Sequence, residues 1–340
     1  MNNSIFVYGC NEQVPEVKRF HFCTWEFKNA TAIVEIGAEL DWQAVEGCDD
    51  YSMSFFIPWV KQGDKVVDLY NKLKLSSNAK FIFNDPIEFT TSLDGGNNQT
   101  GVIHAFYENE PLAVLPLKIE VENSFVRVKL SLGALKNREV NPYFRFYIKT
   151  DVENVSTRKH GLNKSTIIYD VRVNEKRNLP ETLVEQIQRT PLANIQNCFC
   201  LHIIPNDFEL SFFDSSLKNL RAIEDKAFKE YLDDRLFKDE ELMVMFKKKR
   251  SPDSFSFFST FTKERIGAGQ FAFAAFTNLV CGFLLYIPSI RGFDPANKSG
   301  LQKVPSEFWL VLFILLIYGG YVASKVISVA KAKIRLLKRN

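Results

Sequence analysis

The chain has 340 residues, of which 46% are hydrophobic and 24% charged. This is enough for one large hydrophobic core or two modest ones, and a net charge of +3 excludes a strongly basic or strongly acidic protein. Six cysteines scattered through mixed sequence do not follow a disulfide framework. The start MNNSIFVYGCNEQ lacks the basic and apolar regions of a secretory signal, so we expect the N-terminus to stay on the side of synthesis.

A β-rich cytosolic domain is predicted over residues 1–177. Short runs with strand composition are separated by turn signals, and the clearest are RFHFCTWEF (19–27), TAIVEIGAEL (31–40), KFIFND (80–85), SFVRVKLSL (124–132), PYFRFYIKT (142–150) and STIIYDVRVNE (165–175). The sequence SLDGGNNQTG at 92–101 predicts a turn between two strands. Many short strands without intervening helices are typical of a sandwich or barrel.

The pattern changes over residues 178–250, which we interpret as a small α/β segment or a stalk. It predicts a short helix at 180–189, a buried strand at 197–205 and a longer amphipathic helix at 215–236. Residues 251–265 are rich in Ser and Phe and predict an interfacial connector with its rings in the headgroup boundary. Five cations are expected to contact lipid: Lys247, Lys248, Lys249, Arg250 and Lys325.

Two apolar runs predict a transmembrane hairpin, with helices at 266–290 and 307–330 and a basic cytosolic tail at 331–340. The first contains 21 residues without a charge, from Gly267 to Ile287, and at about 1.5 Å per residue this matches a hydrocarbon core of about 30 Å. The flanks outside the hairpin are more basic than the loop inside it. By the positive-inside rule, both termini are cytoplasmic, and we expect a protein with two spans in a bacterial inner membrane.

A basic face on the β-rich domain is the candidate ligand site. Outward positions on three predicted strands hold cations and tyrosines, namely Arg127, Lys129, Tyr143, Arg145, Tyr147, Lys149 and Arg172. If these strands are neighbours, the face combines phosphate contacts with base stacking, which predicts a nucleotide or short oligonucleotide ligand. The alternative is an ordinary solvated sheet face.

No motif of a nucleotide-binding loop, metalloprotease, serine hydrolase or kinase occurs in the sequence, so we expect neither an enzyme nor a cofactor. The best candidates for a metal site are Cys198, Cys200 and His202 together with His21 and Cys23, because alternation places each set on one face of a strand. Buried free cysteines explain the same pattern, and we predict no metal. An enzyme with an unrecognised site within residues 180–250 stays as a third alternative.

The first apolar run carries polar and small residues on one side. Gln270, Ala274 and Asn278 recur every fourth residue, with Thr277 and Cys281 beside them. Polar side chains in hydrocarbon need protein or water opposite them, so this stripe predicts the lining of a pore. Two helices per chain cannot enclose a path, and a pore therefore requires a homo-oligomer such as a tetramer. The alternative is a passive two-helix anchor for a binding or scaffold module.

A cytosolic sensor followed by a two-helix hairpin, with basic flanks at KKKR (247–250) and KAKIRLLKR (331–339), resembles the membrane effectors of bacterial anti-phage abortive-infection systems, such as Hailong-type channel effectors. The resemblance is one of architecture over the whole chain, and no residue role is carried over. It implies a nucleotide or oligonucleotide signal acting on the sensor, helices that open a membrane lesion, and an operon partner that makes or removes the signal.

Overall fold

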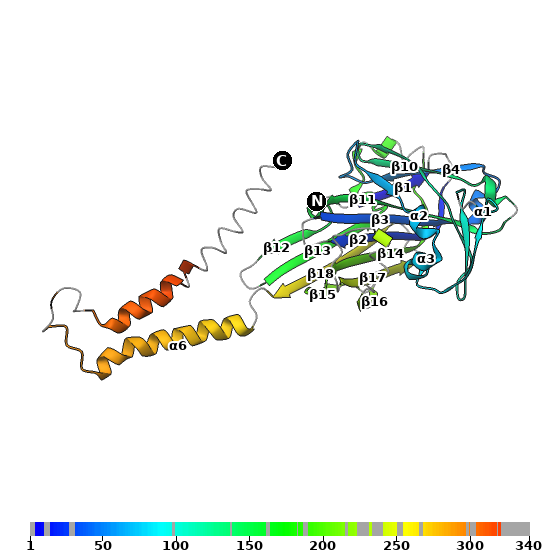
Figure 1. The fold of residues 1–340 in the computed structure, drawn as a ribbon. Helices are drawn as coiled ribbons and strands as arrows, with labels where there is room; N and C mark the ends of the chain where they lie inside the picture. The colour runs from blue at the N-terminus through cyan, green and yellow to red at the C-terminus, as the bar shows by residue number, and fades with distance from the viewer. Residues whose placement is uncertain are drawn as a thin grey trace. The chain divides into compact units, whose positions relative to one another are not determined.

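The computed structural model describes residues 4–9, 14–26, 31–96, 99–136, 138–160, 164–181, 183–185, 190–214, 217–222, 231–232, 241–249, 254–264, 268–296, 299, 304–317 and 319–320 (Figure 1). The chain divides into two compact units, Met1–Lys263 and Glu264–Asn340. Strands dominate the first unit, and helices form the described part of the second.

One mixed sheet of the first unit has eight described strands in the order β15-β18-β13-β1-β4-β10-β9, with β12 beside β13 (Figure 1). β1 and β13 run parallel, and β4 pairs antiparallel with both β1 and β10. The strands are β1 (Ser4–Gly9), β4 (Asp50–Phe56), β9 (Lys118–Glu122), β10 (Phe125–Ser131), β12 (Thr157–His160), β13 (Lys164–Val173), β15 (Glu209–Phe213) and β18 (Phe255–Glu264).

The second mixed sheet has ten described strands in the order β16-β17-β14-β2-β3-β11-β8-β7-β6, with β5 beside β11. β14 runs parallel to β2, and β3 pairs antiparallel with both β2 and β11. The strands are β2 (Glu16–Glu26), β3 (Thr31–Leu40), β5 (Val66–Asp68), β6 (Ile87–Ser92), β7 (Val102–Phe106), β8 (Leu112–Val114), β11 (Asn141–Asp151), β14 (Asn194–Pro205), β16 (Leu217–Ala222) and β17 (Glu241–Lys249).

The two sheets pack face to face as a sandwich, so the predicted mainly β fold is confirmed, and its strands continue past residue 177. Alternation works as the sequence indicated: Val126, Val128 and Leu130 of β10 are buried between the sheets. The Phe55 ring of β4 lies 5.3 Å, centroid to centroid, from the Phe146 ring of β11 in the other sheet. The main core therefore lies between the inner faces of the two sheets.

Short helices join the strands and cover part of the ten-stranded sheet. They are α1 (Trp42–Val45), α2 (Tyr70–Leu73), α3 (Ser76–Phe83) and the 3-10 turns η1 (Gly133–Leu135), η2 (Val152–Asn154) and η3 (Lys176–Asn178). The predicted strand at 80–85 is wrong, because these residues end helix α3, and Asn84 closes the helix in the left-handed region at φ 54°. Its aromatic residues pack on a second hydrophobic cluster outside the sheet.

The predicted α/β segment or stalk at 178–250 is not separate from the sandwich. β14 lies between β2 and β17 inside the ten-stranded sheet, and β16 extends the sheet edge. The predicted strand at 197–205 is confirmed, but the predicted helix at 215–236 is wrong over Leu217–Ala222, which forms β16. Tyr231 and Leu232 are helical and buried, and the rest of that prediction lies outside the described residues.

The predicted interfacial connector at 251–265 is also wrong for its described part. Phe255–Glu264 forms β18, between β13 and β15 in the eight-stranded sheet. Phe255, Phe257 and Phe261 are buried, whereas Phe258 on the opposite face is exposed. The spacing of these rings is the alternation of a strand with one face in a core, rather than the signature of a segment lying in a headgroup layer.

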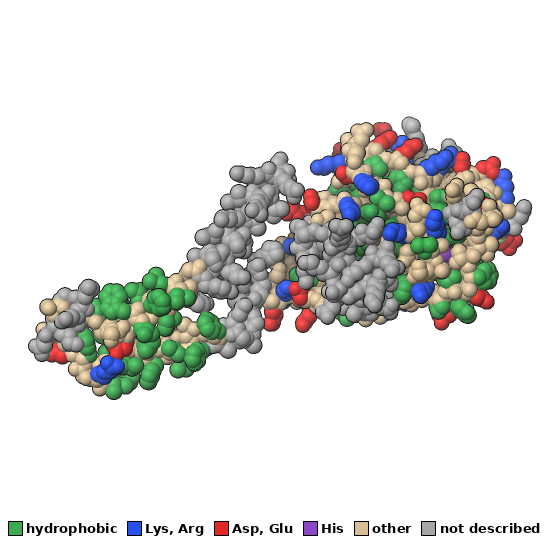
Figure 2. All heavy atoms as spheres, viewed as in Figure 1, with side chains coloured by type: hydrophobic (Ala, Val, Ile, Leu, Met, Phe, Trp, Pro, Cys, Tyr) green, Lys and Arg blue, Asp and Glu red, His purple; other side chains and the backbone are tan. Residues whose placement is uncertain are grey.

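The second unit contains α6 (Ala268–Ile290) and a shorter apolar helix, Ser306–Ile317. Within α6, Phe273–Ile290 is long and apolar enough to cross a membrane by length and composition. Hydrophobic side chains cover the described surface of both helices (Figure 2). The Arg291 guanidinium, just after α6, lies 3.1 Å from the Glu307 carboxylate at the start of the second helix. Residues 321–340, which include the whole of the predicted tail, lie outside the described residues.

Candidate functional site

Charged and polar side chains are concentrated on the outer face of the ten-stranded sheet. Phe20 and Phe22 of β2 point into the main core, so Arg19 and His21, which alternate with them, point outward. Register then aligns outer residues across β2, β3 and β11. Arg19 lies beside Glu39 and His21 beside Gly37, and on the other side Tyr143 lies beside Glu39 and Arg145 beside Gly37. The sequence TAIVEIGAEL carries the signal that the sequence reasoning missed: two acids four residues apart in an otherwise apolar strand.

A buried ion pair occupies the middle of this face. Nη2 of Arg145 lies 2.5 Å from Oε2 of Glu35, and Nε of Arg145 donates to the same oxygen at 2.7 Å. The hydroxyl of Tyr231 donates to that oxygen at 3.3 Å. Burial acts to lower the pKa of Arg145, but the negative charge of Glu35, together with Tyr231, Tyr143 and Cys23, holds the pKa above its ordinary value. Arg145 therefore stays charged inside the protein.

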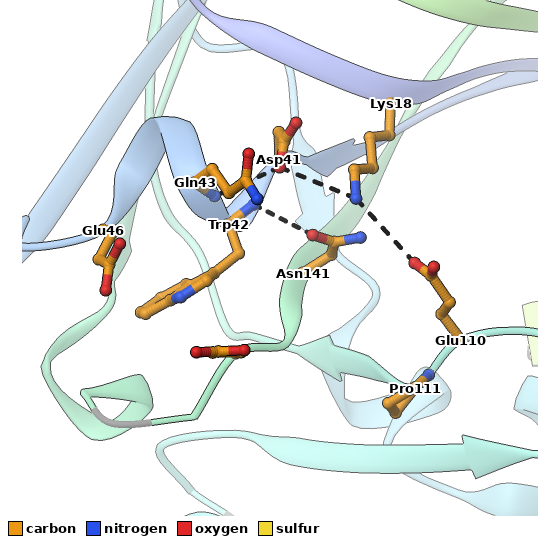
Figure 3. Close-up of a pocket in the computed structure, with 9 residues that line it drawn as sticks. Lys18, Asp41, Trp42, Gln43, Glu46, Glu110, Pro111 and Asn141 are labelled. Atoms are coloured by element: carbon orange, nitrogen blue, oxygen red, sulfur yellow. Dashed lines mark hydrogen bonds and ion pairs between the residues drawn. The ribbon is translucent and has the colours of Figure 1, made fainter.

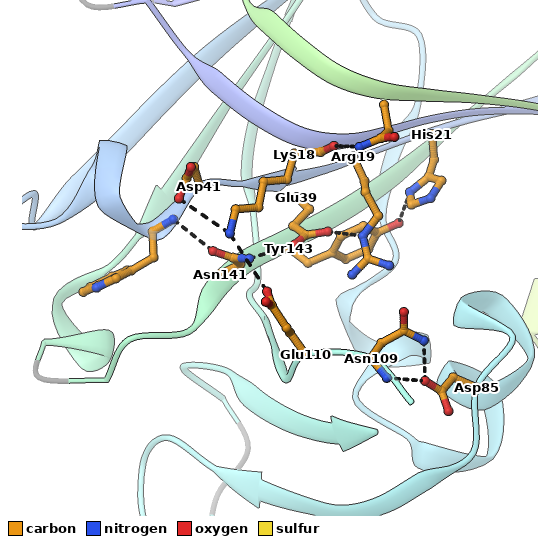
Figure 4. Close-up of polar contacts among 12 residues, drawn as sticks. Lys18, Arg19, His21, Glu39, Asp41, Asp85, Asn109, Glu110, Asn141 and Tyr143 are labelled. Atoms are coloured by element: carbon orange, nitrogen blue, oxygen red, sulfur yellow. Dashed lines mark hydrogen bonds and ion pairs between the residues drawn. The ribbon is translucent and has the colours of Figure 1, made fainter. Parts of the chain in front are cut away.

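Tyr143 links the ion pair to a buried histidine. Its hydroxyl accepts a hydrogen bond from Nη1 of Arg145 at 3.5 Å. The same hydroxyl lies 3.2 Å from Nδ1 of His21 (Figure 4). Burial, with the positive charges of Arg145 and Arg19, holds the pKa of His21 well below its usual range, so the ring is neutral. Gly37 is required here, because a Cβ at that position would clash with the Tyr143 hydroxyl.

A second polar chain runs from Arg19 toward helix α1. Nε of Arg19 donates to Oε2 of Glu39, and Nδ2 of Asn141 donates to Oε1 of the same carboxylate at 2.8 Å (Figure 4). Oδ1 of Asn141 in turn accepts the backbone N–H of Trp42 at 3.0 Å. Asn141 thus satisfies a buried carboxylate and the first turn of α1 with one side chain.

A pocket of about 390 Å³ lies beside this chain and is strongly acidic (Figure 3). Its lining carries the carboxylates of Asp41, Glu46, Glu110 and Glu139 against a single ammonium, that of Lys18. Nζ of Lys18 lies between two of these acids, 3.8 Å from Oδ1 of Asp41 and 4.0 Å from Oε2 of Glu110. Four carboxylates against one cation repel phosphate groups, so this pocket does not fit a nucleotide.

The predicted basic face is not a single surface. Arg127, Lys129 and Arg172 lie in the eight-stranded sheet, whereas Arg145, Tyr147 and Lys149 lie on β11 in the ten-stranded sheet. β10 and β11 are consecutive in sequence, but the chain crosses between sheets at η1, and this overturns the expectation that the strands are neighbours. Arg127 and Lys129 already pair with Glu122 at 3.2 Å and Asp50 at 2.8 Å.

Arg172 and Arg145 fail as ligand contacts for a local reason as well. Nη2 of Arg172 lies 2.7 Å from Oδ2 of Asp170, two residues earlier in β13. Arg145 is buried and held by Glu35. Tyr147 is half-buried, and Lys149 is exposed at the end of β11. The structure therefore does not bring the predicted cations together on one face.

The cations predicted to contact lipid also have protein neighbours where their side chains are described. Nζ of Lys248 lies 2.6 Å from Oδ2 of Asp214, so its charge already has a partner in the sandwich. Nζ of Lys247 lies 4.9 Å from the centre of the Phe199 ring. The side chain of Lys249, and the whole of Arg250 and Lys325, lie outside the described residues.

The candidate metal ligands point in opposite directions. Cys198, Cys200 and His202 face the core between the sheets, while His21 and Cys23 face outward from β2. His202 stacks on Tyr169 with ring centroids 3.8 Å apart, and burial lowers its pKa to about 3. Within the described part of the chain, no three His, Cys, Asp or Glu side chains are close enough to hold a metal ion together.

The predicted pore-lining residues of α6 divide between two sides of the helix. Asn278 is exposed, while Ala274, Thr277 and Cys281 are half-buried. The Thr277 hydroxyl donates to the carbonyl of Phe273 at 2.8 Å, so its polar group is satisfied within the helix. Among the described residues the Asn278 amide has no hydrogen-bond partner. The side chain of Gln270 lies outside the described part.

No protein-family profile matches this chain. No curated protein sequence matches it either. Among solved structures, a candidate protease from Parabacteroides distasonis is similar at 9% sequence identity, with a TM-score of 0.30, over 73% of this chain and 40% of that chain. A likeness of this size carries no argument about activity.

Proposed function

We propose that this protein is a homo-oligomeric membrane channel or pore-forming effector of bacterial phage defence. Its sandwich lies in the cytoplasm and binds a nucleotide or oligonucleotide. α6 and the helix that begins at Ser306 both cross the inner membrane, with the two termini on the cytoplasmic side. An operon partner makes or removes the ligand, and the ligand biases the helices between closed and open packings.

The observation that carries this proposal is the position of Asn278. Its amide is exposed on a helix whose other exposed side chains are mostly large and apolar, including Phe276 and Leu279. Among the described residues it has no hydrogen-bond partner. An unpartnered amide in hydrocarbon costs free energy, so in a membrane it needs a polar group from another copy or water in a pore. An oligomer supplies either partner, which supports the proposal.

Connectivity supports control of the helices by the sandwich. β18 ends at Glu264 and α6 begins at Ala268, so three residues join the second strand of the eight-stranded sheet to the candidate span. A movement of β18 is therefore delivered to α6 through a very short connection. A ligand drives such a movement only through its difference in affinity for the two states, which places its site on the sandwich.

The test is ion flux through liposomes that contain the full-length protein. Asn278→Leu removes the amide and is expected to abolish flux while leaving membrane insertion intact. Thr277→Val is the matched control, because the Thr277 hydroxyl is already bonded to the Phe273 carbonyl and its loss leaves the exposed side unchanged. Equal flux in the wild type and the Asn278→Leu variant would overturn the channel.

The second candidate is a membrane-tethered binding or scaffold module. It is favoured by the apolar side chains exposed around α6, such as Phe271, Leu279 and Phe283, which also suit a passive anchor in lipid. Replacing residues 266–330 by an unrelated two-span anchor distinguishes the two functions. A scaffold keeps its cellular activity in that chimaera, whereas a channel loses it.

A further inference from the structure

The acidic pocket beside helix α1 has the size of a small-ligand site. Its volume of about 390 Å³ lies within the range of about 300–1,000 Å³ that is typical of ligand pockets. The nine described residues that line it come from β2, from α1 and its two ends, from the segment just before β8, and from the start of β11 (Figure 3). Four separate stretches of chain therefore converge on one space.

The described lining has a net charge of −3, from four carboxylates and one ammonium. The ammonium of Lys18 lies near two of these acids, at 3.8 and 4.0 Å. The other two, Glu46 and Glu139, are exposed and form no ion pair with any described residue. Within two sequence positions of the lining residues, only Asn137 lies outside the described part, and it is uncharged. Two carboxylates therefore remain for a cationic ligand.

The indole of Trp42 is a second feature of this pocket and is independent of its charge. The side chain is 7% exposed, and no described group accepts a hydrogen bond from its Nε1. Figure 3 shows the indole projecting from α1 into the space between Glu46 and Asn141. A buried donor without an acceptor costs free energy, so the site favours a ligand that brings an oxygen to this N–H.

The spacing of the acids distinguishes between kinds of cation. Within the described part of the chain, no three His, Cys, Asp or Glu side chains are close enough to hold a metal ion together. An extended organic cation fits better, because its charged groups can reach separate carboxylates. A polyamine supplies such charges but no acceptor for the indole, since its protonated nitrogens only donate. A basic peptide supplies both, because each residue also carries a carbonyl oxygen.

We propose that the acidic pocket beside α1 binds a short basic peptide. Guanidinium or ammonium groups of its Arg or Lys residues pair with Glu46 and Glu139, and one of its backbone carbonyls accepts a hydrogen bond from Nε1 of Trp42. This inference goes beyond the proposed function, because it assigns a second kind of ligand and depends neither on conduction nor on nucleotide binding.

The experiment is isothermal titration calorimetry of the full-length protein in detergent with N-acetyl-L-arginyl-L-arginine amide. The same peptide with citrulline at both positions keeps the shape without the charge and is expected to bind at least about 10-fold more weakly. Glu46→Gln together with Glu139→Gln is expected to weaken binding of the arginine peptide by a similar factor. Trp42→Phe keeps a ring but removes the N–H, and it is expected to weaken binding about 2- to 10-fold.

The matched control is Glu88→Gln together with Glu153→Gln. Both acids are exposed and neither lines the pocket, so the affinity is expected to stay unchanged. Equal losses in the two glutamine pairs, equal binding of the arginine and citrulline peptides, or no binding of the arginine peptide by the wild type would overturn the proposal. Because Glu46 and Glu139 are exposed, their test stands even if Trp42→Phe destabilises the fold.

Spermidine separates a peptide site from a general site for organic cations. It carries positive charges but no oxygen, so we expect it to bind more weakly than the arginine peptide and to be insensitive to Trp42→Phe. Spermidine binding as tight as that of the arginine peptide, with Trp42→Phe affecting neither, would contradict the proposal. None of these outcomes bears on ion flux or on nucleotide binding, so this site and the proposed function can fail separately.

Discussion

The guanidinium of Arg145 and the carboxylate of Glu35 are 2.5 Å apart on neighbouring strands, and both side chains are buried. Removing one partner leaves the other charge unpaired in the interior. We expect Arg145→Met to lower the free energy of unfolding by about 3–5 kcal/mol. Urea denaturation of the full-length protein in detergent, followed by tryptophan fluorescence, measures this change.

The exposed pair Lys129 and Asp50, at 2.8 Å, provides the control for that measurement. Lys129→Met is expected to change the unfolding free energy by less than about 1 kcal/mol, because water and salt screen an exposed pair. The double variant Arg145→Met with Glu35→Leu leaves no unpaired charge and is expected to be more stable than Arg145→Met alone. If Arg145→Met and Lys129→Met cost the same, the buried pair does not stabilise the sheet.

Gly37 makes room for the Tyr143 hydroxyl, and Gly37→Ala tests that relationship. The added Cβ meets the hydroxyl and then the ring, so we expect a loss of about 1–3 kcal/mol in unfolding free energy. Tyr143→Phe removes the oxygen and is expected to recover part of that loss, giving a measurable coupling in a double-mutant cycle. Gly133→Ala is the control, because a Cβ there meets only Asp49, at 3.9 Å.

Asp68 predicts a pH dependence of stability. Its carboxylate accepts the backbone N–H groups of Tyr70 and Leu117, both at 2.9 Å, yet burial raises its pKa to about 6. The folded pKa lies above the unfolded value of about 3.9, so folding favours the protonated form. The contribution of Asp68 to stability is therefore full below about pH 4 and is lost as the pH rises through 6.

Asp68→Asn removes the titrating carboxyl group. A comparison with the wild type therefore isolates the contribution of Asp68 to the pH dependence of stability. Between pH 4 and pH 7 the unfolding free energy of the wild type is expected to fall relative to that of the variant, by at most about 3 kcal/mol. Denaturation curves of both proteins across that range measure the difference. A constant difference over the whole range would show that Asp68 titrates at its unfolded pKa.

Local alternation was sufficient to predict the strands at β2, β3, β10, β11 and β13, and apolar length was sufficient to predict the candidate span in α6. Local alternation could not predict which strands pair with each other. Thr24 and His202 are 178 residues apart, yet Thr24 Oγ1 lies 2.7 Å from His202 Nδ1 because β14 pairs with β2. Other long-range pairings place β15, β16, β17 and β18 in the sandwich, although the local pattern of these segments resembled a stalk and an interfacial segment.

The predicted basic face is wrong at Arg145 because a charged side chain is not always exposed. In PYFRFYIKT the arginine alternates with buried phenylalanines, so Arg145 does point away from the main core. The outer face, however, is itself covered by a second hydrophobic cluster that includes Tyr70 and Leu73 of α2 and also Tyr231. A charged residue facing away from one core was thus buried beneath another, and a single sequence contains no record of that second cover.

The exposed side of α6 predicts where copies of the chain meet. A cysteine at position 278 is expected to form an intermolecular disulfide in membranes treated with a mild oxidant, because an exposed amide in hydrocarbon should face another copy. Asn278→Cys is made together with Cys281→Ser, which removes the cysteine already in α6.

Phe276→Cys in the same background is the control, because position 276 lies about 200° around the helix from position 278 and should face lipid. Non-reducing electrophoresis should show dimers for the first variant alone. Equal cross-linking at both positions, or at neither, would favour the passive anchor over an ordered oligomer.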